Sequence, residues 1–343
     1  MDVLIAALAL LSGTIGAGFA SGREIMRFFA AHGPAAPAAA LSAVGAMGVL
    51  FLLLCRRMEQ SDASTLPALC RARMGRAAGR MAGGLFLLLC ATTGGAMLAA
   101  CAELAALVLP VRGAYALGMA LTLALCLPAS LLGLSGLALP GAALCVLLPA
   151  LLLRLSALPA GEACFLPAMT PDLPVRAMGD GLLYAALNTA MLGGALPMLI
   201  ALPPPRRRRA VLLFGTAFAA LLLPGVHVCR RHRAALFHQA LPFVALGRRL
   251  GPGGYGLVAA CMYAAAASTL MTMLCAIMRM LPMGRRAAAL AAAFSCLLFA
   301  LAGFGPLVES GYPVLGALCA ALLLLLCAAP ARHADQYDRP SAR

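Results

Sequence analysis

The fold of this chain is decided by the stretch Leu11-Ser12-Gly13-Thr14-Ile15-Gly16-Ala17-Gly18-Phe19-Ala20-Ser21-Gly22-Arg23-Glu24-Ile25, inside a first apolar segment at about residues 3–31. Four of the ten residues from 13 to 22 are glycine. Each glycine in a helix interior costs about 1 kcal/mol of helix stability relative to alanine. The helix is therefore easy to unwind here. Unwound backbone at membrane depth is tolerated only where it is buried in protein or lines a water-filled cavity. The stretch thus predicts one wall of a binding site.

Helix packing is the alternative explanation for these glycines. Gly18 and Gly22 form a small-xxx-small pair, which lets two membrane helices approach closely. The charges that follow favour the binding site, because ionisable residues inside a spanning segment are costly and normally face a cavity or a partner. Glu24 and Arg27 are three residues apart, so they can pair on one helix face.

The composition is that of an integral membrane protein. The 343 residues are 63% hydrophobic and 11% charged, whereas soluble domains average about 45–50% and about 25%. No soluble domain is visible, so the lipid bilayer is the expected surrounding. The net charge of +15 comes entirely from arginine and lies mainly in short loops. It is therefore a topology signal, and nucleic-acid binding is not expected.

The thirteen cysteines form no C-x-x-C pair and mostly lie in apolar segments, where a free cysteine behaves as a small hydrophobe. Cys164 and Cys229 fall in loops assigned to the outer side, where a disulfide between them is an open alternative. His227, Cys229, His232 and His238 have no recognised zinc spacing, so no metal site is expected.

Ten segments are apolar enough and about long enough to span a bilayer. They lie at about residues 3–31, 35–55, 81–109, 113–132, 137–157, 179–202, 210–227, 254–281, 287–304 and 311–329. We expect a single membrane domain with a first repeat at about 1–157, an outer loop at 158–178, a second repeat at 179–329 and a tail at 330–343.

The arginines predict the orientation. We place both termini in the cytoplasm. On that side lie 16 of the 26 arginines, in the loops 56–80, 203–209 and 282–286, the adjoining span end and the tail, whereas the outer loops hold seven. The bias has the sign of the positive-inside rule. The outer loop 228–253 is the exception, since it carries five of those seven; within it, residues 234–246 are a candidate interfacial helix. A solvated face is the expected explanation of this charge, and a positive funnel that draws anions is the alternative.

Ten spans divide into five plus five, and both halves open on an interrupted segment. The sixth segment carries its interruption at Asn188-Thr189-Ala190-Met191-Leu192-Gly193-Gly194-Ala195-Leu196-Pro197. An odd number of spans per half inserts the two halves in opposite orientations. Interrupted helices at corresponding positions of two halves indicate a transporter's binding site. The predicted fold is therefore all-helical, with a 5+5 inverted repeat and broken first and sixth helices.

The candidate substrate site lies at these two breaks. Peptide N–H groups of Gly16, Ala17 and Gly18, with Phe19 beside them, begin a half-helix whose positive end favours a carboxylate. Asn188 and Tyr184 are expected to line the opposite wall. For Asn188 the alternative is a hydrogen bond between helices.

Further candidates serve ion coupling. Ser268 and Thr269 in the eighth segment carry hard oxygen donors, although such hydroxyls often bond back to their own helix. Glu24 and Glu103 are the acids of the first and third segments and are candidate protonatable groups. Glu103 is seven residues before Pro110, so the alternative is that it reaches the outer interface.

The glycine-rich stretch 13–22, with Glu24-Ile25 and Phe28-Phe29, resembles the start of the YkvI-like bacterial membrane proteins. That family is related to the amino acid–polyamine–cation transporter superfamily, which has the LeuT fold. Gln239-Ala240-Leu241-Pro242, followed by Ser268-Thr269, resembles the family's loop and eighth span. Arg23 stands where the family has glutamine.

The resemblance implies a sodium site. Its ligands would be the hydroxyls of Ser268 and Thr269 and the carbonyls of Ser12, Ile15 and Ala265. Some relatives use protons and a lysine in the fifth span instead. This chain has no lysine, and Arg154, at the predicted outer end of that span, is expected to extend to the interface.

The expected function is secondary transport of a small solute, an amino acid or related organic ion, coupled to Na⁺ or H⁺ in the bacterial cytoplasmic membrane. A non-transporting sensor on the same fold is the alternative. An enzyme is not expected, because the sequence has no H-E-x-x-H or G-x-S-x-G motif; residues 133–137 come nearest to the latter. No cofactor is expected, and the oligomeric state is left open.

Overall fold

The computed structural model describes residues 2–132, 138–159 and 174–329. Within these ranges all regular structure is helical, and seven helices are long and apolar enough to cross a membrane. The protein is therefore an all-helical, multi-pass membrane protein. Cys164, the tail, most of the loop 158–178 and residues 133–137 lie outside the described residues.

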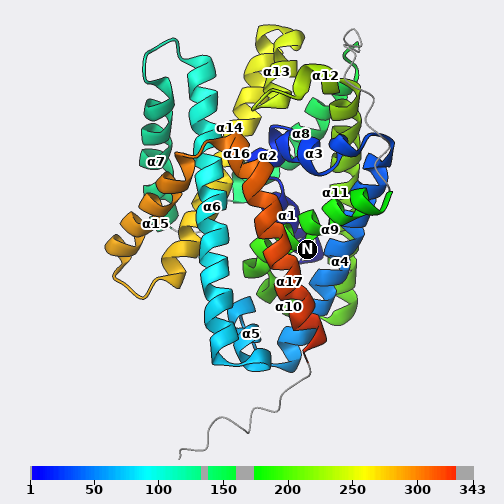
Figure 1. The fold of residues 1–343 in the computed structure, drawn as a ribbon, viewed down its shortest axis with the longest axis vertical. Helices are drawn as coiled ribbons and strands as arrows, with labels where there is room; N and C mark the ends of the chain where they lie inside the picture. Colours follow the sequence, from blue (N-terminus) through cyan, green and yellow to red (C-terminus); the bar gives the residue numbers. More distant parts are fainter. Residues whose placement is uncertain (1, 133–137, 160–173, 330–343) are drawn as a thin grey trace, which may run out of the picture.

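Each predicted segment contains a helix (Figure 1). The α-helices are α1 (Asp2–Thr14), α2 (Ala17–Ala20), α3 (Arg23–Phe28), α4 (Ala36–Gln60), α5 (Leu66–Met74), α6 (Arg76–Val108), α7 (Ala114–Leu132), α8 (Ala138–Ser156), α9 (Pro174–Met191), α10 (Leu196–Ile200), α11 (Pro204–Arg231), α12 (Arg233–Leu236), α13 (Pro242–Gly247), α14 (Gly251–Met280), α15 (Arg285–Ala300), α16 (Phe304–Pro306) and α17 (Tyr312–Ala328). Shorter 3₁₀ segments are η1 (Ala30–Ala35), η3 (Leu192–Ala195) and η4 (Arg248–Leu250), and η5 (Leu307–Gly311) is a turn of π-helix.

The long helix α6 stands between two groups of helices (Figure 1). It packs against α7, α14 and α15 on one side, while α4 packs against α9 and α11, and α17 against α9. The first segment, α1 to α3, lies among these helices, and the residues from Thr14 to Gly22 are all buried. The glycine-rich stretch is therefore inside the protein, which is what an interrupted membrane helix requires.

Three details of the loops differ from the sequence predictions. Arg206–Arg209 were predicted in a loop, but they lie in the first turns of α11, which begins at Pro204 because proline is favoured at a helix start. The loop 56–80 contains a helix, α5, that was not predicted. The candidate interfacial helix at 234–246 is not a single helix, since the chain forms two short helices and Pro242 begins the second.

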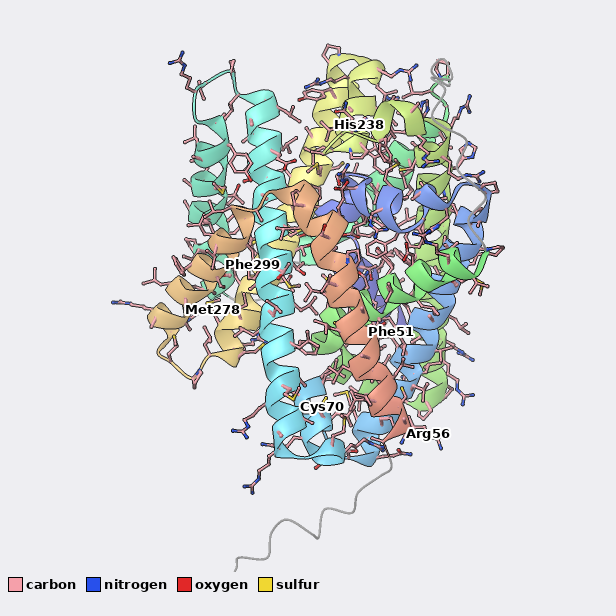
Figure 2. All side chains as sticks on the ribbon, in the orientation of Figure 1. Phe51, Arg56, Cys70, His238, Met278 and Phe299 are labelled. Atoms are coloured by element: carbon pink, nitrogen blue, oxygen red, sulfur yellow. The ribbon has the colours of Figure 1, made fainter. Side chains whose placement is uncertain are left out.

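Arginines tie the predicted inner segments together at one end of the bundle. Arg57 and Arg73 donate hydrogen bonds to carbonyls at the end of α17, at 2.7 Å for Cys327 and 2.9 Å for Ala329 respectively. Figure 2 shows Arg56 and Cys70 near this end and His238 at the opposite end. The helices α12 and α13 also lie at the opposite end (Figure 1).

Candidate functional site

The first helix is broken twice. Helix α1 ends at Thr14, and Gly16 is extended, with φ −97° and ψ −174°. A single turn, α2, follows, and Gly22 then takes φ +81°, a left-handed conformation that glycine adopts without a steric cost. A Cβ at Gly22 would also come within 2.9 Å of the Phe243 ring. The prediction of an unwound helix in this stretch is confirmed.

The interruption of the sixth segment is milder. Residues 192–195 tighten into the 3₁₀ helix η3 between α9 and α10, and the residues on both sides keep right-handed helical dihedrals. Such tightening inside a helix often marks a hinge. The two interruptions meet, because α1 packs on η3 and the Leu192 side chain lies directly against Gly13.

A buried carboxylate occupies the first break. Glu24 in α3 is only 7% exposed, and its side chain folds back onto Gly18 so closely that no Cβ fits there. The hydroxyl of Tyr184 donates a hydrogen bond of 3.3 Å to Glu24 Oε2. Tyr312, a buried residue at the start of α17, interacts electrostatically with the same carboxylate. Among the described residues Glu24 has no ion-pair partner, so the pairing with Arg27 that the spacing allows does not form.

Aromatic rings close the space around Tyr184. Its ring centroid lies 5.3 Å from that of Phe28 and 5.0 Å from that of Phe29, both edge-on, and it stacks on Phe218 at 6.4 Å. These rings come from α3 and the residue that follows it, from α9 and from α11, and they are essentially inaccessible to solvent. They exclude water from one side of Glu24 and fix the Tyr184 hydroxyl toward it.

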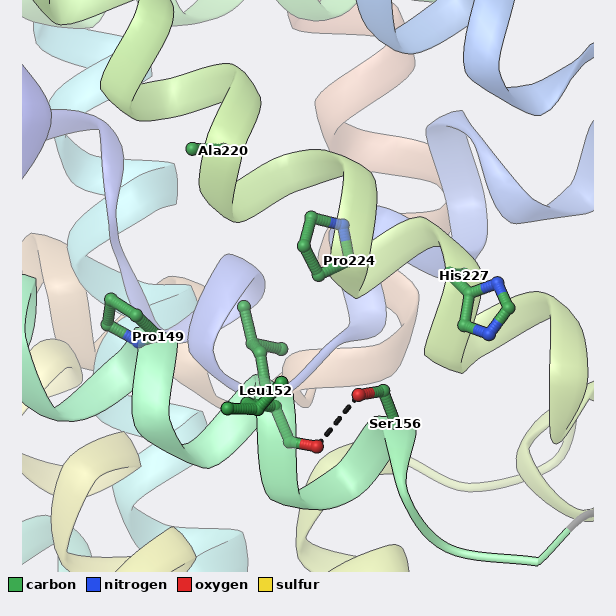
Figure 3. A pocket seen from close by; sticks show the side chains of 7 residues that line it. Pro149, Leu152, Ser156, Ala220, Pro224 and His227 are labelled. Carbon is green, nitrogen blue, oxygen red and sulfur yellow. Dashed lines mark hydrogen bonds between the residues drawn. The ribbon is translucent and has the colours of Figure 1, made fainter.

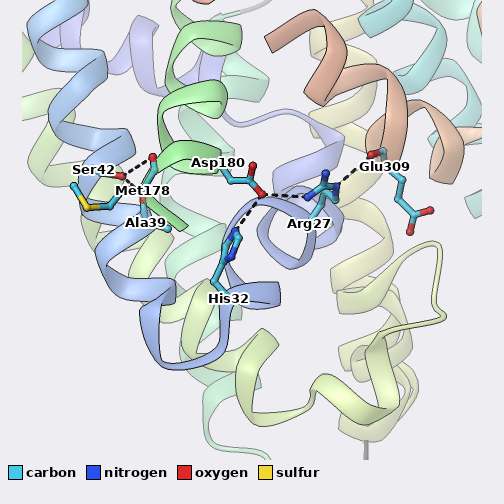
Figure 4. Close-up of polar contacts among 7 residues, drawn as sticks. All are labelled: Arg27, His32, Ala39, Ser42, Met178, Asp180 and Glu309. Carbon is cyan, nitrogen blue, oxygen red and sulfur yellow. Dashed lines mark hydrogen bonds and ion pairs between the residues drawn. The ribbon is translucent and has the colours of Figure 1, made fainter. Parts of the chain in front are cut away.

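A cluster of charged residues lies beyond the second break; we call Arg23, Arg27, His32, Asp180 and Glu309 the ion cluster. Arg27 donates a 3.3 Å hydrogen bond to Asp180 Oδ2, and His32 Nε2 lies 3.1 Å from the same oxygen (Figure 4). Arg27 also donates to the Glu309 carbonyl at 3.2 Å, while Arg23 forms an ion pair with the Glu309 side chain. The ion cluster therefore joins α3 and η1 to α9 and to η5.

Arg23 also reaches the chain between α12 and α13. Its guanidinium donates to the Gln239 carbonyl at 2.8 Å, and the Phe243 N–H donates to the Ser21 carbonyl at 2.8 Å. The position of Arg23 gives it a structural task that needs several N–H donors arranged in a fork.

The predicted substrate-binding residues have partners within the protein. The Ala17 N–H donates to Met97 Sδ at 3.2 Å, and α2 has only four residues, so this amide is not open to a ligand. Asn188 Nδ2 donates to the Tyr184 carbonyl at 3.0 Å. That bond is within α9, whereas the alternative considered for Asn188 was a bond between helices. Gly16, Gly18 and Phe19 are all buried at the break.

The predicted ion-binding residues lie near the same break. The Thr269 hydroxyl oxygen is 3.5 Å from the place of a Cβ on Gly16, so α14 touches the first helix where it unwinds. Ser268 Oγ donates to the Ala265 carbonyl at 3.0 Å, the bond to its own helix that the sequence left open. Of the other two candidates, Ile15 is fully buried and Ser12 is half-buried.

Glu103 lies apart from Glu24. Its Oε1 accepts a 3.2 Å hydrogen bond from the Phe304 N–H and so caps the start of α16. Cys229 is a buried free cysteine whose thiol lies 3.8 Å from the Gly22 carbonyl.

Sequence reasoning missed Tyr312, Asp180 and Glu309. The chain has only 11 acidic residues, and each one near an apolar segment needs a partner. Asking which arginine each acid could meet would have drawn attention to Asp180 and Glu309. Tyr312 carries no such signal.

Comparison of the chain with known family models and with curated proteins finds no match. Its class therefore rests on the fold alone: a multi-pass helical membrane protein whose first membrane segment is broken inside the bundle.

Proposed function

We propose that this protein is a secondary transporter that moves a small solute, an amino acid or related organic ion, in exchange for or together with protons. One observation carries the proposal: Glu24 lies buried at the unwound part of the first helix, hydrogen-bonded to Tyr184 and without a cationic partner among the described residues. A carboxylate in such surroundings is costly to keep ionised. It gains stability by holding a proton whenever water is excluded.

The architecture supports an alternating-access cycle. On this proposal the ten helical segments form two inverted repeats of five, and their interrupted first helices meet at Gly13 and Leu192. Unwound helices at a repeat interface are where transporters bind solute and coupling ion. Both termini would lie in the cytoplasm of a bacterial cell, because 16 of the 26 arginines lie in the loops and tail assigned to the same side as the termini.

Glu24 would couple proton and solute movement through hydration. When the bundle is closed, the aromatic rings and Gly18 leave the carboxyl group no water, so the protonated form is favoured. When one side opens, water reaches Glu24 and the proton can leave to that side. Sodium coupling through Ser268 and Thr269 is the competing choice, and the Ser268 hydroxyl would first have to release the Ala265 carbonyl.

The test is uptake by purified protein in liposomes, using radiolabelled amino acids and putrescine as probes, under either a pH gradient or a Na⁺ gradient. A pH gradient is expected to drive accumulation. Glu24→Gln cannot release a proton and is expected to lose gradient-driven uptake while still binding the probe. Asp62→Asn is the matched control, because Asp62 is an exposed acid at the opposite end.

Two results would overturn the proposal. If Ser268→Ala with Thr269→Ala abolishes Na⁺-driven uptake while Glu24→Gln changes nothing, the ion is sodium and Glu24 is not the coupling group. If a probe binds but accumulates under neither gradient, the protein is a sensor and not a transporter.

A further inference from the structure

Two hollows adjoin on the surface near the ends of α8 and α11, and His227 lines both. The first is a groove of about 500 Å³ between these helices. Figure 3 shows Pro149 and Leu152 on the α8 side and Ala220, Pro224 and His227 on the α11 side. The second is a pocket of about 370 Å³ beyond His227.

Prolines account for the groove. Pro224 lies inside α11 and has no N–H, so the Ala220 carbonyl four residues earlier has no helical donor. Pro149 lies inside α8 and acts in the same way on that helix. The two rings line the space between the helices. Leu153, on the rim, is 72% exposed. The groove therefore opens on the side of α8, where the bilayer surrounds a membrane-spanning helix.

The pocket beyond His227 is basic. Arg230, Arg231 and Arg233 line it together with Ala30 and Gly33, and none of the lining residues that the structure describes is acidic. Arg231 also donates a 3.4 Å hydrogen bond to the carbonyl of Ser156, which lines the groove. Arg231 therefore stands at the junction of the apolar groove and the basic pocket.

The order and spacing of these features match an amphiphile. Ala220, Pro224 and His227 follow one face of α11, and Arg230 lies ten residues beyond Ala220. At 1.5 Å per residue this is about 15 Å, half of the roughly 30 Å hydrocarbon core of a bilayer. An acyl chain in the groove would place its headgroup at the arginines.

The location of these arginines needs an explanation. The loop 228–253 holds five of the seven arginines assigned to the outer side, which opposes the positive-inside bias of the rest of the chain. A solvated face would not require three arginines to gather around one pocket. An anionic group in the pocket would be attracted by this concentration of positive charge.

We propose that this composite site binds a phospholipid of the surrounding bilayer that has an anionic headgroup. One acyl chain lies between α8 and α11 over Pro149 and Pro224, and the headgroup phosphate lies among Arg230, Arg231 and Arg233. The site is separate from the Glu24 region and does not depend on the transport proposal. It holds α8 against α11, the helix that supplies Phe218 to the ring cluster around Tyr184.

The experiment uses the full-length protein in neutral detergent. It is titrated with phosphatidylglycerol, with phosphatidylcholine of the same acyl chains and with inorganic phosphate; native mass spectrometry counts bound lipid, and thermal unfolding is followed in parallel. We expect phosphatidylglycerol to bind about tenfold more tightly than phosphatidylcholine. Inorganic phosphate at millimolar concentration is expected to leave the unfolding temperature unchanged.

Variants locate the site. Arg230→Gln with Arg231→Gln is expected to remove the preference for phosphatidylglycerol. Arg208→Gln with Arg209→Gln is the matched control, because it removes two exposed charges from the other end of α11 and should keep the preference. Ala220→Phe fills the groove and should weaken both lipids. Arg230→Gln alone is measured too, since Arg231 also contacts Ser156.

The proposal fails if the wild-type protein binds the two lipids equally, or if the double arginine variant keeps its preference. It also fails if inorganic phosphate stabilises the protein as well as phosphatidylglycerol does, because the pocket is then a site for a free anion. The comparison of the two lipids on the wild-type protein tests the proposal even where a variant does not fold.

Discussion

At the scale of single residues, the relation between Gly18 and Glu24 shapes the first break. The two are six positions apart, yet the Glu24 side chain occupies the volume that any side chain at 18 would need. Glycine at 18 therefore has two effects: it lowers the stability of the helix there, and it leaves room for a buried carboxyl group. The group packed against Gly18 is thus the Glu24 side chain and not a second helix, which was the packing alternative considered for this glycine.

Gly18→Ala is accordingly expected to destabilise the protein by about 1–3 kcal/mol, the usual cost of overpacking. Thermal unfolding with a thiol-reactive dye is a suitable measurement, since nearly all described cysteines are buried. Gly45→Ala is the control, because nothing lies near its Cβ position in α4. That change should stabilise by up to about 1 kcal/mol through helix preference. Equal effects at both sites would contradict the buried position of Glu24.

At the scale of elements, Arg207 joins three helices. It lies in the first turn of α11 and donates hydrogen bonds to the carbonyls of Leu199, at 3.0 Å, and Leu202, at 3.1 Å. Carbonyls at a helix end have no partners within the helix, and a cation there also suits the helix dipole. The same guanidinium pairs with Glu59 at the end of α4. The arginine thus fixes the α10–α11 connection to α4.

We expect Arg207→Gln to cost about 2 kcal/mol of stability, because several hydrogen bonds to a charged donor are lost at once. Arg208→Gln, one residue along and exposed, should change stability by less than about 0.5 kcal/mol. In a double-mutant cycle with Glu59→Gln the coupling should be at most about 1 kcal/mol, since the Glu59 side chain is 40% exposed. A larger coupling would mean that the ion pair, and not the carbonyl contacts, carries the effect.

At the scale of the whole molecule, both ends of the bundle are held by arginines. Arg57, Arg73 and Arg207 connect α4, α5, α10 and α17 at one end. At the other end the ion cluster, through Arg23 and Arg27, connects the first segment to α9, η5 and the chain before α13. The alternating-access cycle that we propose would require these two sets of contacts to open in turn.

Removing Arg23 should therefore loosen one end only. In Arg23→Gln we expect Cys229, which is fully buried beside Gly22, to react several-fold faster with a water-soluble maleimide. Peptide mapping by mass spectrometry measures each cysteine, and the half-buried Cys327 at the opposite end gives the reference rate. Arg112→Gln removes the same charge from an exposed loop and should leave Cys229 protected. Unchanged protection in Arg23→Gln would show that Arg23 does not hold this end closed.

Local patterns were enough to predict the helices but not their connections. Runs of apolar residues predicted ten segments, and each of them contains a helix. Among the described residues, seven helices are long and apolar enough to cross a bilayer. Helix α5 was missed because it is amphiphilic and short, and its stability comes from packing on α6. The arginines at 206–209 were predicted in a loop because four consecutive charges end the apolar run, although the helix itself begins at Pro204.

The sequence by itself determined that the chain is a helical membrane protein and that its first helix unwinds at the glycines, because hydropathy and glycine content act locally. Only the tertiary structure decided which polar groups meet. It pairs Arg27 with Asp180, 153 positions away, and leaves Glu24 to Tyr184, 160 positions away. Those choices depend on how helices distant in the chain pack together, and no spacing within one helix encodes them.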